Sequence, residues 1–266
     1  MKHASPVTQS MIDRFRESYD RNPSNRALTA ALSKHDLEET AFSPADAAKM
    51  RQTFTIEIKT HDVTNQKRSG RCWLFASMNL MRERIIEKCS LESFELSGNY
   101  FAFWDKFEKI NWFLEAAIGT ADLPVADRTF DWLMQCPLGD GGQWDMMVSL
   151  VEKYGIVPYD VMPETYQSCN SWAFTDLLNT RLRKCAIELR SLAAEGKDPA
   201  SSKVGMLQEF FNALCLAYGK PPERFDFEYR DKDRNFHADR NLTPLEFYRK
   251  YAGGDLTDFV SVIHAP

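Results

Sequence analysis

One stretch of the chain decides how the sequence is interpreted, and it reads Gln66-Lys67-Arg68-Ser69-Gly70-Arg71-Cys72-Trp73-Leu74-Phe75-Ala76. A helical pattern follows it to about Lys88. The first two turns after Cys72 are apolar on nearly all sides and the later turns are charged, which is typical of a helix that begins buried and ends at the surface. The pattern therefore predicts a helix with Cys72 at its N-terminus.

The predicted position of Cys72 suits nucleophilic chemistry. A thiol attacks as the thiolate, and the dipole and unpaired amides of a helix N-terminus stabilise that charge. Gly70 lets backbone or substrate approach closely, and Gln66 can offer a side-chain amide beside the Cys72 backbone N–H to an oxyanion. A cysteine at a helix start is more often a small buried apolar residue, so the flanking residues decide between the two interpretations.

Three cations, Lys67, Arg68 and Arg71, surround the predicted nucleophile. They would favour the thiolate or bind a substrate carboxylate. The other interpretation, an ordinary solvated loop, is equally compatible with the sequence.

The composition is that of an ordinary soluble globular protein. The 266 residues carry a formal net charge of −5, and 44% are hydrophobic and 27% charged. This acidic balance gives no support for a nucleic-acid partner, and the longest apolar stretch, at residues 73–80, is too short to cross a bilayer. The N-terminus lacks the apolar segment of a secretory signal, so we expect a cytoplasmic protein without a membrane partner.

The cysteines and histidines give no sign of a metal site. Six cysteines are spread thinly through the chain without a CxxC pair, and we expect them to be free thiols. The five histidines are equally scattered, and no Cys/His cluster has the spacing of zinc ligands. We therefore expect neither a metal nor another cofactor.

Most of the chain is predicted to be helical. The alternation of Phe54, Ile56 and Ile58 predicts a half-buried strand at Thr53–Thr60, and a second strand is expected to begin at Phe259–Ile263. Helices are expected at Thr8–Asp20 and Asn25–Ser33, after the cap Ser97, before Gly155, twice within Trp172–Tyr218, and after the capping box of Thr243 and Glu246.

The order of residues around Cys72 resembles a known family. Gln66 followed six residues later by Cys72-Trp73-Leu74-Phe75 is similar to the active-site segment of papain-like cysteine peptidases. Residues 69–76 resemble more closely the bleomycin hydrolase and aminopeptidase C branch. The resemblance implies that Cys72 is the nucleophile and Gln66 the oxyanion-hole residue. Secreted relatives usually have a disulfide cysteine where this chain has Ser69, as the cytosolic branch does.

A second motif, Asp140-Gly141-Gly142-Gln143-Trp144, resembles the glycine pair that lines the cleft in this family. Gly141 and Gly142 would pair with the substrate backbone, since a side chain there would block an extended peptide. With similar stretches at 229–233 and 242–248, the resemblance extends over essentially the whole chain.

Papain-type chemistry also requires a histidine base and an asparagine that orients it, and we expect neither within these residues. His237 lies in a charged stretch and is expected at the surface, whereas His264 has only two residues after it, so no asparagine can follow. Asn170 stands in an Asn-Ser-Trp string like that of the family's asparagine site. It precedes both histidines and is expected to be a helix cap instead.

The resemblance implies an α+β papain-like fold whose β-rich domain is largely missing from this chain. We expect N-terminal helices and a lead-in strand at 1–60 and the helical domain with the nucleophile at 61–170. A helical insertion is expected at 171–254, and the truncated start of the β-rich domain at 255–266.

The implied function is that of a cysteine aminopeptidase which removes N-terminal residues from peptides and assembles as a homo-hexamer, with residues 177–251 as candidate subunit contacts. The alternative is a non-catalytic truncated paralogue or fragment that serves as an assembly or peptide-binding scaffold. In a third interpretation, a second polypeptide supplies the missing half.

Overall fold

The computed structural model describes residues 6–50, 53–253, 256, 259–260 and 262. The chain divides into two compact units, Met1–Lys59 and Thr60–Pro266. In its described part the first unit holds helices α1 (Gln9–Arg21), α2 (Pro23–Leu32), α3 (Leu37–Ala41) and α4 (Pro44–Ala47). None of these helices contains a buried residue, so the first unit has no core of its own within the described residues.

The lead-in strand predicted at Thr53–Thr60 is not formed, and that prediction was wrong. Phe54, Ile56 and Ile58 are 72%, 81% and 80% exposed, and the described part of the first unit contains no other strand. An alternating segment becomes a strand only where a neighbour pairs with its N–H and C=O groups. Here no neighbour does, so the alternation has no structural consequence.

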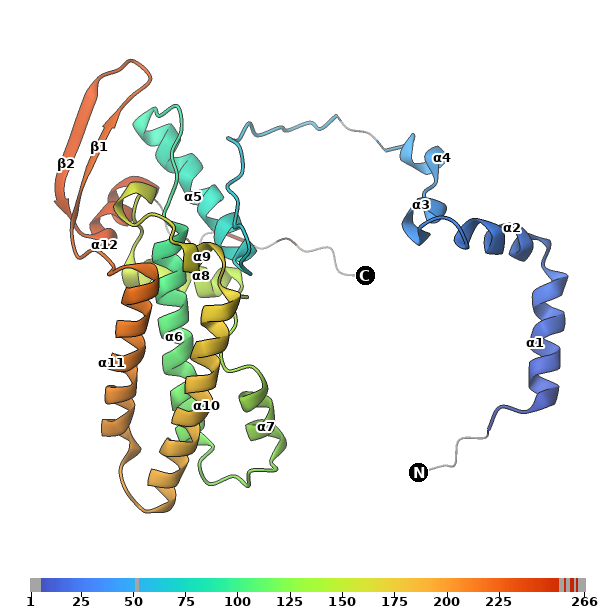
Figure 1. The fold of residues 1–266 in the computed structure, drawn as a ribbon. Helices are drawn as coiled ribbons and strands as arrows, with labels where there is room; N and C mark the ends of the chain where they lie inside the picture. Colours follow the sequence, from blue (N-terminus) through green and yellow to red (C-terminus); the bar gives the residue numbers. More distant parts are fainter. Residues whose placement is uncertain (1–5, 51–52, 254–255, 257–258, 261, 263–266) are drawn as a thin grey trace. The chain divides into compact units, whose positions relative to one another are not determined.

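The second unit is a helical body built around α6 (Gly98–Gly119). The helix packs against α5, α7, α8, α10 and α11, and Figure 1 shows it running alongside α10 and α11. Aromatic residues of this helix form part of the core, with Phe101 and Phe103 at 1% and 0% exposure. The other helices are α5 (Cys72–Cys89), α7 (Arg128–Gln135), α8 (Trp144–Tyr154), a 3-10 turn (Tyr159–Val161), α9 (Tyr166–Cys169), α10 (Trp172–Ala194), α11 (Pro199–Tyr218), α12 (Pro244–Phe247) and a π-helical turn (Tyr248–Ala252).

The predicted helix boundaries in this body are confirmed. Ser97 Oγ accepts a backbone N–H and caps α6, and Thr243 and Glu246 form the capping box of α12. Gly155 follows the last residue of α8 with a φ of 75°. A Cβ at this glycine would lie 2.2 Å from the carbonyl carbon of Pro244, so its absence lets the end of α8 touch the start of α12.

A β-hairpin lies inside the segment predicted to be a helical insertion, so the prediction of helix alone was wrong there. Strands β1 (Phe225–Arg230) and β2 (Phe236–Leu242) pair antiparallel. Alternate residues of β1 are apolar and buried at its start, which is the signal that a strand gives. Phe227 of β1 meets the ring of Phe247 edge-on, with 4.9 Å between centroids, and this contact fixes the hairpin on α12.

The C-terminal expectations fall at the edge of the described structure. Of the strand predicted at Phe259–Ile263, residues 259, 260 and 262 are described and are not in a strand, and His264 lies outside the described residues. Within the described part of the chain, no helix is both long and apolar enough to cross a membrane.

Candidate active site

Cys72 is the first residue of α5, and its side chain is exposed, so the predicted helix start is confirmed. The inner face of α5 anchors the helix in the core through residues such as Leu74 and Met81, which are 0% and 1% exposed. The N–H groups in the first turn of a helix have no partner within the helix. The Cys72 N–H can therefore donate to a bound oxyanion.

Gln66 begins the loop that leads into α5. Its Oε1 is buried without a hydrogen-bond partner in the described part of the chain, whereas its backbone carbonyl accepts a bond of 2.7 Å from Ser69 Oγ. The loop then turns at Lys67, whose φ is 57°. The atom that would donate to an oxyanion is Nε2, and it too makes no hydrogen bond with the described residues.

The predicted glycine pair is held against the residues on both sides of Cys72. Trp73 Nε1 donates to the Asp140 carbonyl oxygen at 2.7 Å, and the Gly70 N–H donates to Asp140 Oδ2 at 3.2 Å. A Cβ on Gly142 would lie 2.5 Å from the Trp73 ring, whereas one on Gly141 would meet nothing within 4 Å. Gly142 is thus required by packing on the indole, and Gly141 faces open space that a substrate backbone can use.

Asp140 is the acceptor that joins these segments. Its carboxylate receives Lys106 Nζ at 2.5 Å and the Ser171 hydroxyl, and the Lys106 side chain is only 2% exposed. Burial by itself would raise the pKa of Asp140, but Lys106, Ser171 and the Gly70 N–H together lower it to about 2. The carboxylate is therefore ionised at neutral pH and fixes α6, α10 and the two loops at one point.

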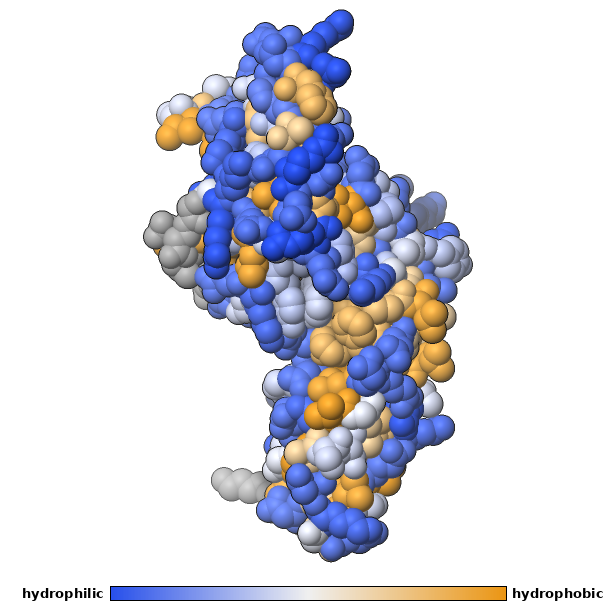
Figure 2. Space-filling view, turned by 90° about the vertical axis from the view of Figure 1, so that its left-hand side faces the viewer, coloured by the Kyte–Doolittle hydropathy of each residue, from blue (hydrophilic) through white to orange (hydrophobic). Residues whose placement is uncertain are grey.

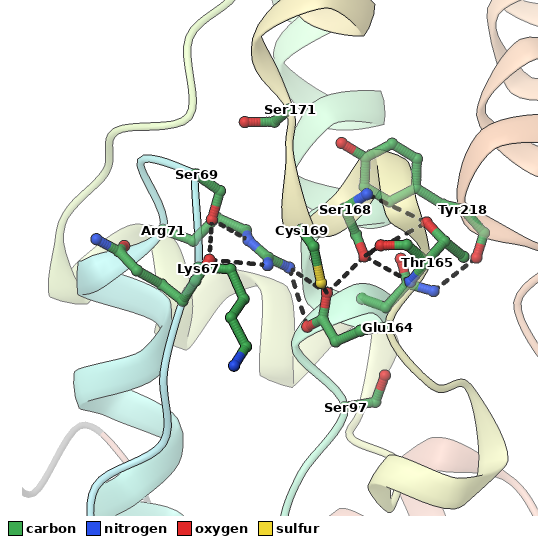
Figure 3. A network of polar contacts seen from close by, with 12 residues as sticks. Lys67, Ser69, Arg71, Ser97, Glu164, Thr165, Ser168, Cys169, Ser171 and Tyr218 are labelled. Atoms are coloured by element: carbon green, nitrogen blue, oxygen red, sulfur yellow. Dashed lines mark hydrogen bonds and ion pairs between the residues drawn. The ribbon is translucent and has the colours of Figure 1, made fainter.

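Arg71 differs from the two cations beside it in sequence. Lys67 and Arg68 are exposed, but Arg71 is 3% exposed. Its guanidinium points toward Ser69 and Glu164 (Figure 3) and lies 3.1 Å from both carboxylate oxygens of Glu164. The interpretation of the whole cationic run as a solvated loop was therefore wrong for Arg71.

The described histidines of the second unit are engaged away from Cys72. The ring of His61 contacts Glu83 at 2.8 Å. His237 lies on β2, contacts Asp231 at 2.9 Å and stacks on Tyr229. The contacts of both rings within the described part of the chain are with these neighbours and not with Cys72.

Asn170 is the C-cap residue of α9. Its Nδ2 donates to the Tyr166 hydroxyl at 3.0 Å, and it forms an isolated bridge with Arg68. The prediction that Asn170 is a helix cap is therefore confirmed, at the C-terminal end of a helix. Among the described residues, no group of three or more His, Cys, Asp or Glu side chains could hold a metal ion.

Comparison with known proteins decides the family. A family model described as the Peptidase C1-like family matches residues 6–266. The chain belongs to the Peptidase C1-like family. Its similar relatives in this family include aminopeptidase C of Lactobacillus delbrueckii subsp. lactis, 45% identical over 263 residues that make up 98% of this chain and 59% of the relative. Aminopeptidase W of the same organism is 39% identical over 98% of this chain and 60% of the relative.

These relatives confirm the predicted resemblance to the aminopeptidase C and bleomycin hydrolase branch of the papain-like cysteine peptidases. A solved structure of the family, PepW from Lactobacillus rhamnosis HN001, is similar with a TM-score of 0.90 and 45% identity, over 96% of this chain and 58% of that chain. The papain-like fold is therefore confirmed. The chain spans about three fifths of the length of these relatives.

The site contains two contributions that the sequence interpretation missed. Lys106 lies in the aromatic-rich stretch of α6, and a lysine among buried aromatic residues indicates a buried cation that needs a partner. That signal was available, although it does not say which carboxylate is the partner. The sequence does not indicate that Arg71 is buried, because it stands in the same short stretch as two other cations, Lys67 and Arg68, which are exposed in the structure.

Proposed function

We propose that the protein is a cysteine aminopeptidase that removes N-terminal residues from peptides. The observation that carries the proposal is the placement of an exposed cysteine thiol at the N-terminus of α5. The loop that leads to it begins at Gln66, whose side-chain oxygen has no partner in the described part of the chain, and Asp140 of the glycine loop accepts bonds from Gly70 and Trp73 on either side of the thiol. Relatives over nearly the whole chain are named aminopeptidase C.

In this reaction the Cys72 thiolate attacks the carbonyl carbon of the first peptide bond. The carbonyl oxygen becomes an oxyanion, which the Cys72 N–H and the Gln66 side-chain amide stabilise. The bond to the leaving amine then breaks as that amine takes a proton from the catalytic histidine, and an acyl-enzyme remains. Water hydrolyses the thioester and restores the thiol.

The histidine base and its orienting asparagine are proposed to come from outside this chain. Two observations support this: the contacts of His61 and His237 within the described structure are with residues other than Cys72, and the relatives are longer than the chain. In this proposal a β-rich domain of the papain-like fold would carry both residues.

Assembly and location belong to the same proposal. A homo-hexamer in the cytoplasm, acting on peptides, accords with six free thiols and with exposed apolar side chains on the predicted insertion. Leu177, Val204 and Leu216 are 64%, 66% and 90% exposed, and the face drawn in Figure 2 carries several apolar patches among hydrophilic side chains. Surfaces of this kind are covered in assemblies, and sedimentation of the natural gene product as a monomer would contradict the hexamer.

The test compares Cys72→Ala with Cys136→Ala in the natural gene product. Cys136 is also an exposed free thiol, so its substitution is a matched control. We expect hydrolysis of aminoacyl-coumarins to fall at least about 10⁴-fold in Cys72→Ala and to stay unchanged in the control. A peptide epoxide should label Cys72 and leave Cys136 unmodified. Turnover retained without Cys72 would refute the mechanism, and a wild type that binds peptide without hydrolysing it would favour the scaffold function.

A further inference from the structure

We propose that Arg71 is a positioning residue for the oxyanion site: it fixes the Gln66 loop to the helical body through Ser69 and Glu164. This inference deepens the proposed function and rests on it. Arg71 would not touch the substrate; it would act by holding Gln66 at the correct place beside the Cys72 N–H.

The guanidinium of Arg71 uses its whole donor fork within the protein. Nε donates to Ser69 Oγ at 2.8 Å, one terminal nitrogen binds Glu164, and the other reaches the Gln66 carbonyl oxygen at 3.4 Å. Ser69 Oγ itself donates to the same carbonyl at 2.7 Å. Arg71 thus reaches Gln66 by a direct contact and by a relay through the Ser69 hydroxyl. Figure 3 shows the guanidinium lying between Ser69 and Glu164.

The loop needs such a restraint, because its own backbone is strained. Lys67 has a φ of 57°, a left-handed conformation that costs a non-glycine residue on the order of 1 kcal/mol or more. Backbone bonds hold the next residue, since the Arg68 N–H donates to the Cys169 carbonyl at 2.9 Å. Arg71 and Ser69 fix the opposite side of the turn, where Gln66 lies.

Glu164 is itself held rigidly, so it can act as an anchor. Ser168 Oγ donates to Glu164 Oε2 at 2.5 Å. A Cβ on Gly98 would lie 2.6 Å from Glu164 Oε1, so this glycine leaves the space that the carboxylate occupies at the start of α6. The anchor therefore belongs to the same body that carries α5.

The geometry distinguishes positioning from an electrostatic role. Because Glu164 lies 3.1 Å from the guanidinium and its side chain is 15% exposed, the charge of Arg71 is already paired. To stabilise the Cys72 thiolate by its charge, Arg71 would have to be free of a carboxylate partner, and it is not. A lysine at this position would keep the charge but lacks the planar fork that makes several bonds at once.

The experiment uses the natural gene product and three substitutions. The first is the double variant Arg71→Met/Glu164→Leu, which replaces a buried ion pair by apolar groups and spares the fold an unpaired charge. The second is Arg71→Lys, and the third is Ser69→Ala, which removes only the hydroxyl relay. Lys153→Met is the control for the loss of an ion pair elsewhere, because Lys153 pairs with Glu108 at 2.5 Å outside the Gln66 loop and outside the predicted subunit contacts.

Two readouts separate loop geometry from general damage. The first is kcat for an aminoacyl-coumarin, which depends on the oxyanion donors. The second is the rate constant for alkylation of Cys72 by iodoacetamide, followed by mass spectrometry, since displacement at an sp³ carbon forms no oxyanion. We expect kcat to fall between about 10-fold and 10³-fold in the double variant and in Arg71→Lys, and less in Ser69→Ala, while alkylation stays within about twofold.

A coupling measurement tests whether the effect passes through Gln66. In a Gln66→Ala background, the double variant should lower kcat no further, because two changes that act through one group are not additive. Equal losses in both backgrounds, full rescue by Arg71→Lys, or a parallel loss of Cys72 alkylation would each overturn the inference. A wild-type protein without turnover would instead refute the proposed function, and this inference with it.

Discussion

The buried pair of Asp140 and Lys106 should be the most sensitive electrostatic contact in the second unit. The two side chains are 13% and 2% exposed and lie 2.5 Å apart, and Lys106 Nζ has one further partner, Thr175 Oγ1 at 2.9 Å. Asp140→Asn would leave the buried ammonium of Lys106 without the carboxylate that contacts it, and only the more distant charge of Asp105 would remain. Removing one partner of a buried pair costs about 3 to 5 kcal/mol, and we expect a loss of this size in the free energy of unfolding at pH 7.

The lowered pKa of Asp140 predicts an acid dependence of stability to which Lys106, Ser171 and the Gly70 N–H all contribute. This pKa falls from an ordinary 3.8 to about 2 in the folded protein, a difference worth about 2 to 3 kcal/mol. Since the folded pKa is lowered, this stabilisation is present above pH 4 and is lost as the pH falls from about 4 to about 2. Asp140→Asn should lack this component of the acid dependence.

The assay is guanidinium unfolding at pH 7 and over an acid series, followed by tryptophan fluorescence. Lys106→Met/Asp140→Asn should recover most of the stability lost in Asp140→Asn, because it removes the unpaired ammonium while the Asn side-chain oxygen can still accept from Gly70 and Ser171. Asp226→Asn, at an exposed pair with Arg240, is the control and should change little. A loss below about 1 kcal/mol in Asp140→Asn, or a double variant as unstable as the single one, would refute the reasoning.

Two packing predictions follow from close contacts elsewhere in the second unit. Gly142→Ala places a methyl group 2.5 Å from the Trp73 ring and should destabilise the protein by about 1 to 3 kcal/mol. Gly141→Ala meets open space, so this variant should keep the stability of the wild type but raise KM for peptides. Equal free energies of unfolding in urea for Gly141→Ala and Gly142→Ala would contradict the different roles assigned to the two glycines. Phe247→Ala removes a fully buried ring at the hairpin and should cost about 3 to 5 kcal/mol. Phe236→Ala, at a ring that is 54% exposed, should cost far less, and similar unfolding midpoints for both would count against the hairpin core.

Local sequence rules predicted the helical body well because its signals are local. The cap Ser97, the capping box at Thr243 and the helix start at Cys72 each involve residues within four positions of one another, and the structure places all three as expected. Strands depend on a partner instead. No strand pairs with the alternating segment Thr53–Thr60, and it is not a strand. The alternating segment of β1 pairs with β2 and is a strand.

The contacts that hold the residues around Cys72 join positions that are far apart in the sequence. Gly70 and Arg71 each bind a carboxylate far along the chain, at Asp140 and Glu164, and no spacing rule connects such positions. All four residues belong to the second unit, and the two carboxylates are held by α6 and α9 neighbours rather than by the loop. The helical body alone therefore fixes the residues on the N-terminal side of Cys72. A histidine supplied by another part of the protein would meet a thiol whose flanking residues are already held in place.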